Sequence, residues 1–172
     1  MDEIEVKILE VNKKEVEKKL ISLGAKKVFE GILEALFFDL GHVIRDADGT
    51  FRLRKEEDKT FMTYKKKIPH DKIKIRDETE IEVSSFNEAK KLIESLGFKE
   101  IKNLKKKRVT YQLHDVKFEF DEYLSKHNFV PLFLEIEART LDDIYKYIKL
   151  LGFSIKDCKH WSTKEIIEHY SA

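Results

Sequence analysis

Charged and apolar side chains alternate along several short segments of this 172-residue chain. Near its start, Glu3, Glu5 and Lys7 alternate with Ile4 and Val6, and the same every-other-residue pattern returns in later segments. Because successive side chains of a β-strand point to opposite faces, each such strand has one ionic and one apolar face. The pattern therefore predicts a sheet with one strongly charged face.

The charged residues of these segments come in pairs of the same sign, which argues against a merely solvent-facing side. Carboxylates are paired as Glu3/Glu5, Glu78/Glu80 and Glu135/Glu137, and cations as Arg52/Arg54 and Lys106/Arg108. Carboxylates suit hard divalent cations, whereas arginine and lysine neutralise phosphate groups. The set predicts a site for a divalent metal ion together with a polyphosphate.

Composition limits the classes of partner. The 34 Lys and Arg residues balance 33 Asp and Glu residues, so a net charge of +1 favours neither nucleic acid nor an acidic membrane surface. The length predicts a single domain over 1–172. The lone Cys158 excludes an internal disulfide framework, and no apolar run is long enough to span a membrane. We therefore expect a cytoplasmic protein.

Four segments begin with a polar cap and an acidic residue three positions later, which is typical of a helix start. They predict helices at 12–23, 85–96 and 140–151 and a terminal helix from Ser162 to about Tyr170. A glycine follows each of the first three, and glycine readily adopts the left-handed conformation that ends a helix. These glycines are Gly24, Gly97 and Gly152.

Strands are expected between the helices, at 2–9, 27–39, 50–56, 60–67, 74–83, 98–113, 116–124 and 132–139. Their adjacency favours antiparallel hairpins whose apolar sides are covered by helices. The residues expected on the helix-covered side are Ile4, Val6, Leu53, Tyr64, Ile81, Val109 and Ile136. The predicted fold is α+β, a closed or nearly closed antiparallel β-barrel forming a tunnel with a charged interior and helices packed outside. The alternative is an open α+β sheet with one wet face.

The order and spacing of the charged motifs resemble those of the CYTH superfamily of triphosphate tunnel proteins, nearest its class IV adenylyl cyclase-like branch. The resemblance covers nearly the whole chain. Its motifs are Glu3-Ile4-Glu5-Val6-Lys7, Arg52-Leu53-Arg54, Thr63-Tyr64-Lys65, Arg76 with Glu78 and Glu80, Lys106-x-Arg108 with Tyr111, Asp121, and Glu135-Ile136-Glu137. The segment 124–133 departs from the family pattern, which places a Leu-Gly pair before the Phe that precedes Glu-Ile-Glu.

The resemblance implies roles for these residues. The expected phosphate-binding residues are Lys7, Arg52, Arg54, Lys65, Arg76, Lys106 and Arg108. The expected ligands of Mg²⁺ or Mn²⁺ are Glu3, Glu5, Asp121, Glu135 and Glu137. Residues expected to act directly in catalysis are Glu3, Glu5, Lys7, Arg54 and Lys65. For Arg76 and the supporting Glu78 and Glu80, an ion pair in the tunnel wall and direct ligand contact both remain open.

The implied function is a metal-dependent reaction on a small-molecule triphosphate. In an adenylyl cyclase-like reaction, the ribose 3′-hydroxyl of ATP attacks the α-phosphorus and pyrophosphate leaves. In the alternative, a triphosphatase hydrolyses tripolyphosphate, thiamine triphosphate or a nucleoside triphosphate. A further alternative is a non-enzymatic polyphosphate or nucleotide sensor. The protein is expected to be a monomer or homodimer, with no nucleic-acid or membrane partner.

Overall fold

The computed structural model describes residues 2–68 and 74–171, with the side chains of all of these except residues 2, 3 and 74–76. The strands are β1 (Asp2–Leu9), β2 (Lys26–Asp39), β3 (Gly49–Glu56), β4 (Lys59–Ile68), β5 (Lys74–Val83), β6 (Lys99–Leu113), β7 (Val116–Tyr123), β8 (Phe133–Ala138) and β9 (Cys158–Lys159). The α-helices are α1 (Lys13–Ser22), α2 (Val43–Asp46), α3 (Phe86–Ser95), α4 (Leu141–Leu150) and α5 (Thr163–Tyr170). Short 3₁₀ turns, η1 and η2, lie at Ser125–His127 and Ile155–Asp157.

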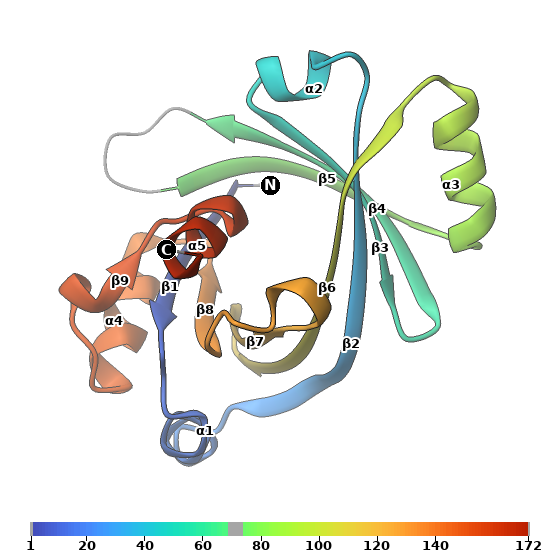
Figure 1. Cartoon of the computed structure of the whole chain (residues 1–172). Helices are drawn as coiled ribbons and strands as arrows, with labels where there is room; N and C mark the ends of the chain where they lie inside the picture. Colours follow the sequence, from blue (N-terminus) through green and yellow to red (C-terminus); the bar gives the residue numbers. More distant parts are fainter. Residues whose placement is uncertain (1, 69–73, 172) are drawn as a thin grey trace.

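The described strands form one curled antiparallel sheet in the order β5-β4-β3-β2-β6-β7-β8-β1-β9 (Figure 1). β5 also pairs with β1, over four residue pairs from Asp2 opposite Asp77 to Glu5 opposite Lys74. The α+β antiparallel architecture is therefore confirmed. The expected closed or nearly closed barrel needs correction: within the described residues β1 and β5 share this short ladder, and the strands form a tunnel-like curled sheet that is not closed into a barrel.

The apolar outer side of the curled sheet is covered in two places. α1 and α4 pack on β1, β7 and β8, where Leu20 and Ile144 join Val6, Phe118 and Ile136 in the largest hydrophobic cluster. Burial of such side chains contributes about 1.5–3 kcal/mol each. The expected helix-covered role of Val6 and Ile136 is confirmed.

α3 covers a second part of the outer side, on the opposite side of the molecule from α4 (Figure 1). Its Ile93 packs against Leu36 and Phe38 of β2 and Leu53 of β3. The helix does not extend over all of β5, and Ile81 is 50% exposed. The expectation that Ile81 faces a covering helix is wrong.

α5 lies against one end of the space inside the sheet. Its Ile166 is fully buried against the inward-facing Leu104 of β6, Tyr123 of β7 and Phe133 of β8. Val130, from the segment that departs from the family pattern, joins the same cluster. This end of the interior is therefore filled with apolar side chains, and the charged part lies beyond them.

The helix boundaries follow the predicted caps. Side chains of Asn12, Ser85 and Thr140 accept hydrogen bonds from backbone N–H groups three residues later, and Ser162 with Glu165 forms a complete capping box. The predicted glycines after α1, α3 and α4 have φ of +91°, +95° and +83°. Within residues 2–68 and 74–171, no helix has the length and apolar character that crossing a membrane requires.

The short helix α2 and the two-residue strand β9 were not predicted from the sequence. α2 depends on Asp39, whose carboxylate accepts hydrogen bonds from the backbone N–H groups of Leu40 (2.7 Å), Ile44 (3.0 Å) and Arg45 (3.4 Å). Burial raises the pKa of Asp39, but these hydrogen bonds outweigh it, so the net pKa lies below its ordinary value. The loop that carries α2 is therefore stabilised by hydrogen bonds to the ionised side chain of Asp39.

We predict that Asp39→Asn lowers the urea midpoint at pH 7 and that the difference from the unmodified protein shrinks in acid. A group whose pKa is lowered by folding contributes stability above its unfolded pKa, 3.8 for Asp, and this contribution is lost as the pH falls through the folded value. Urea titrations at pH 7 and pH 3 measure the effect. The matched control is Asp46→Asn, at an exposed position of α2. An equal difference at both pH values contradicts the role of the ionised carboxylate.

Candidate active site

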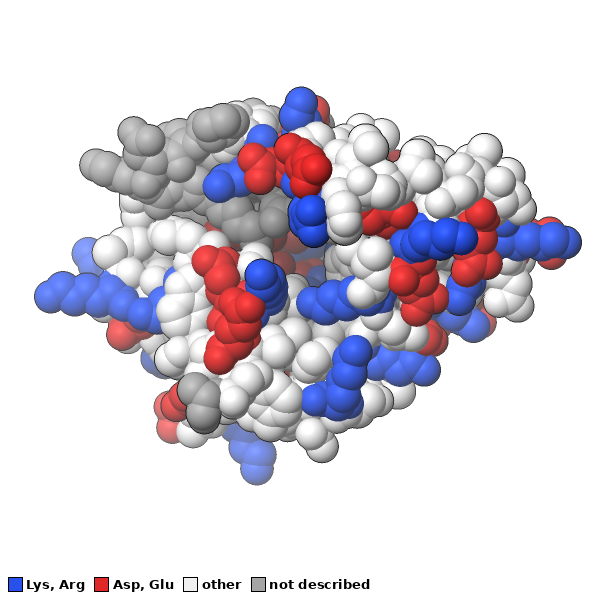
Figure 2. All heavy atoms as spheres, turned by 45° about the horizontal axis from the view of Figure 1, so that its top comes forward, with Lys and Arg blue, Asp and Glu red and all other residues white. Residues whose placement is uncertain are grey.

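The inward faces of the curled sheet enclose a cavity of about 640 Å³. Figure 2 shows the hollow, with acidic and basic side chains around it. Its size is within the range of small-molecule sites, about 300–1,000 Å³. The predicted site residues that line it are Glu5, Lys7, Arg52, Arg54, Lys65, Glu78, Glu80, Lys106, Arg108, Glu135 and Glu137.

Two predicted residues cannot be placed in this way. The side chains of Glu3 and Arg76 lie outside those that the structure describes. Their backbones are paired with each other in the ladder between β1 and β5. Their assigned roles remain predictions.

The register of β1, β8 and β7 brings the acidic residues together. Lys7 lies opposite Glu135, and Glu135 lies opposite Glu119 on the next strand. In the adjoining row, Glu5 lies opposite Glu137. Residues directly opposite in an antiparallel pair have side chains on the same face, so both rows point into the cavity.

Three carboxylates form the acidic cluster of the cavity: Glu119, Glu135 and Glu137 each offer an oxygen, and these oxygens lie within 4.8 Å of one another. Glu119 was not predicted. Strand alternation could have found it, because it lies two residues before Asp121 and thus on the same face. Burial raises the pKa of Glu119; nearby Arg108 opposes the rise, whereas Glu135 adds to it. The carboxylates of the cluster therefore repel one another, and a bound cation would reduce this repulsion.

Lys7 connects the cluster to Glu5. Its ammonium is buried and lies 2.9 Å from a carboxylate oxygen of Glu5 and 2.9 Å from one of Glu135. Burial lowers the pKa of Lys7, but Glu135 and Glu5 more than offset it, so the net pKa is raised. Lys7 is therefore a fixed positive charge beside the acidic cluster.

Asp121, predicted as a metal ligand, lies in a different arrangement. Its oxygens accept hydrogen bonds from Arg108 Nε and Nη2, each at 2.6 Å, and from Lys106 Nζ at 2.6 Å. Burial raises the pKa of Asp121, but Arg108 and Lys106 outweigh it and lower the pKa to about 2. Arg108 Nη1 also forms an ion pair with Glu119. Asp121 is thus placed to orient two cations.

A second wall, from β3, β4 and β5, carries the remaining predicted cations. Arg54 lies 3.2 Å from Glu80 and 2.9 Å from Glu56, and Lys65 lies 2.5 Å from Glu78. The glutamates of β5 therefore form ion pairs with cations of the wall, one of the two alternatives left open for them.

Arg52 is the least neutralised of these predicted cations. Its nearest ion-pair contact is Glu80 at 3.7 Å, and it donates to Thr63 Oγ1 at 3.4 Å. Its Nε has no hydrogen-bond partner among the described residues. Burial and the neighbouring Arg54 lower the pKa of Arg52 to about 10. An anion would satisfy this guanidinium.

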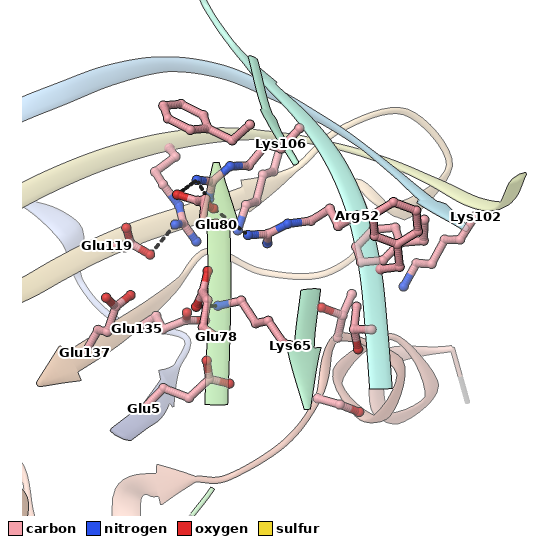
Figure 3. Close-up of a pocket in the computed structure, with 18 of the residues that line it drawn as sticks. Glu5, Arg52, Lys65, Glu78, Glu80, Lys102, Lys106, Glu119, Glu135 and Glu137 are labelled. Atoms are coloured by element: carbon pink, nitrogen blue, oxygen red, sulfur yellow. Dashed lines mark hydrogen bonds and ion pairs between the residues drawn. The ribbon is translucent and has the colours of Figure 1, made fainter. Parts of the chain in front are cut away.

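The cavity is electrostatically asymmetric (Figure 3). Glu5, Glu119, Glu135 and Glu137 lie toward one side of it, Lys102 lies toward the other, and the Arg52 side chain reaches between them toward Glu80. Lys102 was not among the predicted site residues, yet it lines the cavity together with Ser162 and Thr163 at the start of α5. Strand alternation could have identified Lys102, because it lies on the same face of β6 as Lys106 and Arg108.

The arrangement suits a metal ion and a phosphate chain together. Three carboxylate oxygens close to one another are the hard ligands that Mg²⁺ or Mn²⁺ prefers. Buried guanidinium and ammonium groups in the same cavity suit phosphate oxygens.

A CYTH domain model matches residues 1–147, and the chain belongs to the CYTH family. A Methanocaldococcus jannaschii protein named as a candidate adenylate cyclase is 32% identical over 154 residues, which cover 88% of this chain and 84% of that protein.

Solved structures agree with this membership. A Pyrococcus horikoshii protein superposes with a TM-score of 0.78 at 30% identity, covering 95% of this chain and 98% of its own. A Hippeastrum protein described as a candidate adenylyl cyclase with a dominant triphosphatase activity superposes with a TM-score of 0.64, covering 98% of this chain and 95% of its own. At 14% identity, the latter likeness shows the fold alone.

Proposed function

We propose that this protein is a divalent-metal-dependent enzyme acting on a triphosphate, and that it converts ATP to cyclic AMP and pyrophosphate as an adenylyl cyclase does. The observation that supports this most directly is the three-carboxylate cluster in the same cavity as several buried cations. The named activity of the 32%-identical Methanocaldococcus jannaschii relative favours the cyclase reaction.

The metal ligands in this proposal are Glu119, Glu135 and Glu137, with Glu5 beside them. A bound Mg²⁺ or Mn²⁺ would supply charge stabilisation at the reacting phosphorus and lower the pKa of the attacking hydroxyl. Lys7 neutralises charge on the same side of the cavity. Asp121 orients Arg108 and Lys106 without contacting the substrate.

The phosphate-binding residues are Lys7, Arg52, Arg54, Lys65, Lys106 and Arg108. They are held before the substrate arrives, because most of them already form ion pairs with carboxylates. Fixed charges of this kind stabilise developing negative charge without reorganisation during the reaction. In the cyclase reaction, the ribose 3′-hydroxyl gives its proton to water and its oxygen forms a bond to the α-phosphorus. The bond between the α-phosphorus and the oxygen bridging to the β-phosphorus breaks, and pyrophosphate leaves.

We also propose that residues 1–172 work as one domain. The family match ends at residue 147, yet α5 packs its Ile166 against Tyr123 and Phe133 of the curled sheet. The last helix therefore packs on the same sheet that forms the site, although it lies beyond the family match.

A phosphorus NMR time course tests the reaction with ATP, tripolyphosphate and thiamine triphosphate, each with Mg²⁺ or Mn²⁺ and with EDTA. Cyclic AMP and pyrophosphate appearing together from ATP, only with metal, is the expected result. Release of orthophosphate instead would contradict the cyclase activity and show that the protein is a triphosphatase, and the compound that is hydrolysed would identify its substrate. Binding without turnover of any compound would contradict both reactions and favour a sensor.

Arg52→Gln is expected to weaken tripolyphosphate binding about 10- to 100-fold, because a hydrogen bond to a charged group contributes about 1.5–3 kcal/mol. Orthophosphate binding should change much less, since a single phosphate can use the other cations. Calorimetry without metal measures both affinities. Arg139→Gln, at an exposed position outside the cavity lining, is the control. Equal losses for the two ligands would argue against a multi-phosphate site.

A further inference from the structure

Lys102 differs from the predicted cations whose side chains the structure describes. Each of those has a carboxylate oxygen within 4 Å, whereas no such ion pair is found for Lys102 among the described residues. Its ammonium instead lies 5.5 Å from the centre of the Phe37 ring. Lys102 thus contributes positive charge to the cavity with no carboxylate partner in the part of the chain that the structure describes.

The sheet register places Lys102 close to Arg52. Phe37 of β2 lies opposite Lys102 of β6 on one side and opposite Arg52 of β3 on the other. The three residues therefore form one row on the inner face, and strand spacing puts the backbones of the two cations about 10 Å apart. The Arg52 side chain reaches toward Glu80, whereas the Lys102 ammonium stays beside the Phe37 ring (Figure 3). A phosphate chain lying along the row would therefore meet the two cations in turn.

Neighbouring residues reinforce the positive potential here. Burial and the nearby Lys126 lower the pKa of Lys102. Lys126 belongs to η1, within the segment 124–133 that departs from the family pattern. Phe37 also packs with the apolar cluster around Ile166 of α5, so the row lies next to the filled end of the interior.

The acidic cluster lies toward the other side of the cavity from this row (Figure 3). A triphosphate ester has its most negative group at its free terminal phosphate. The positive charge of Lys102 therefore favours that phosphate at its end of the row, while a phosphate nearer the ester end lies at the acidic cluster.

We propose that Lys102 binds the free terminal phosphate of a nucleoside triphosphate at the α5 end of the cavity, and that Arg52 contacts the next part of the phosphate chain. This inference rests on the proposed function and adds the orientation of the substrate. It places the α-phosphorus, rather than the γ-phosphorus, nearest the acidic cluster, as the cyclase reaction requires. It also makes Lys102 a residue that selects for an unesterified terminal phosphate.

The test compares ATP with its γ-phosphate methyl ester, which keeps the chain but removes one terminal charge. Calorimetry measures the two affinities, and EDTA removes the metal so that no turnover occurs during the measurement. The variants are Lys102→Met, which keeps the apolar stem over Phe37, and the control Lys105→Met, at an exposed position of the same strand paired with Glu34. The unmodified protein and the control are expected to bind ATP about tenfold more tightly than the ester. In Lys102→Met the two affinities should agree within about twofold.

Several outcomes overturn the proposal. An ATP-to-ester ratio in Lys102→Met equal to that of the unmodified protein excludes Lys102 as the residue that contacts the terminal phosphate. No discrimination by the unmodified protein excludes the orientation itself. If either occurs while Arg52→Gln still weakens ATP binding, the triphosphate site stands and only this inference fails. Absence of ATP binding contradicts both the inference and an ATP-dependent function.

Discussion

Glu137→Gln is expected to reduce metal-dependent turnover by about 100-fold or more while leaving the fold intact. The substitution keeps the shape of the side chain and removes one charge from the cluster of Glu119, Glu135 and Glu137. Loss of a preorganised charged group at a reacting centre typically costs 10²–10³ in rate, about 2.7–4 kcal/mol. Initial rates with the substrate found by NMR, and Mn²⁺ affinity by electron paramagnetic resonance, measure the effect.

The matched control for Glu137→Gln is Lys117→Gln. Both variants break the same ion pair, 2.9 Å between Lys117 Nζ and Glu137 Oε1, whose lysine is half exposed. An ion pair at the mouth of the cavity whose lysine is half exposed contributes about 0–1 kcal/mol, so neither variant should unfold. If both variants lose rate to a similar extent, the effect of Glu137→Gln comes from breaking the ion pair and Glu137 is not a metal ligand. If Glu137→Gln alone loses both rate and Mn²⁺ affinity, the result supports Glu137 as a metal ligand.

Arg108→Met is expected to lower the free energy of unfolding by about 3–5 kcal/mol, the usual cost of breaking a buried ion pair by removing one partner. Arg108 is 7% exposed, and its guanidinium contacts both Asp121 and Glu119, which are 0% and 6% exposed. Without it, Asp121 keeps Lys106. Glu119 would lose its ion pair with Arg108, the one found for it among the described residues, while remaining beside Glu135.

Urea titration of Arg108→Met measures this loss. Arg108→Lys should lose less, because it keeps the charge but not the bidentate fork. Adding Glu119→Gln to Arg108→Met should recover part of the stability, because it removes the carboxylate charge that has lost its partner. Arg45→Met, at an exposed position, should stay within about 0.5 kcal/mol. A loss below about 1 kcal/mol in Arg108→Met would mean that water already reaches these carboxylates.

The secondary structure was largely readable from local patterns. The caps at Asn12, Ser85, Thr140 and Ser162 are confirmed because each hydrogen bond joins residues three apart in the sequence. α2 escaped prediction because its stabilising group, Asp39, lies before the helix in the preceding strand. β9 was not predicted because a strand of two residues is too short to show an alternating pattern. Its pairing with β1 joins Cys158 to Ile8, which is distant in the sequence.

The sequence by itself determined which side chains share a face, because strand periodicity is local, and through its motifs it determined the family. Only the tertiary structure decided which of those side chains meet. Glu119 and Asp121 stand on the same face of β7, yet Glu119 lies opposite Glu135, whereas Asp121 lies opposite Phe133 and Arg108. One therefore joins the acidic cluster and the other orients cations, since the register between strands distant in sequence is set by packing of the whole sheet.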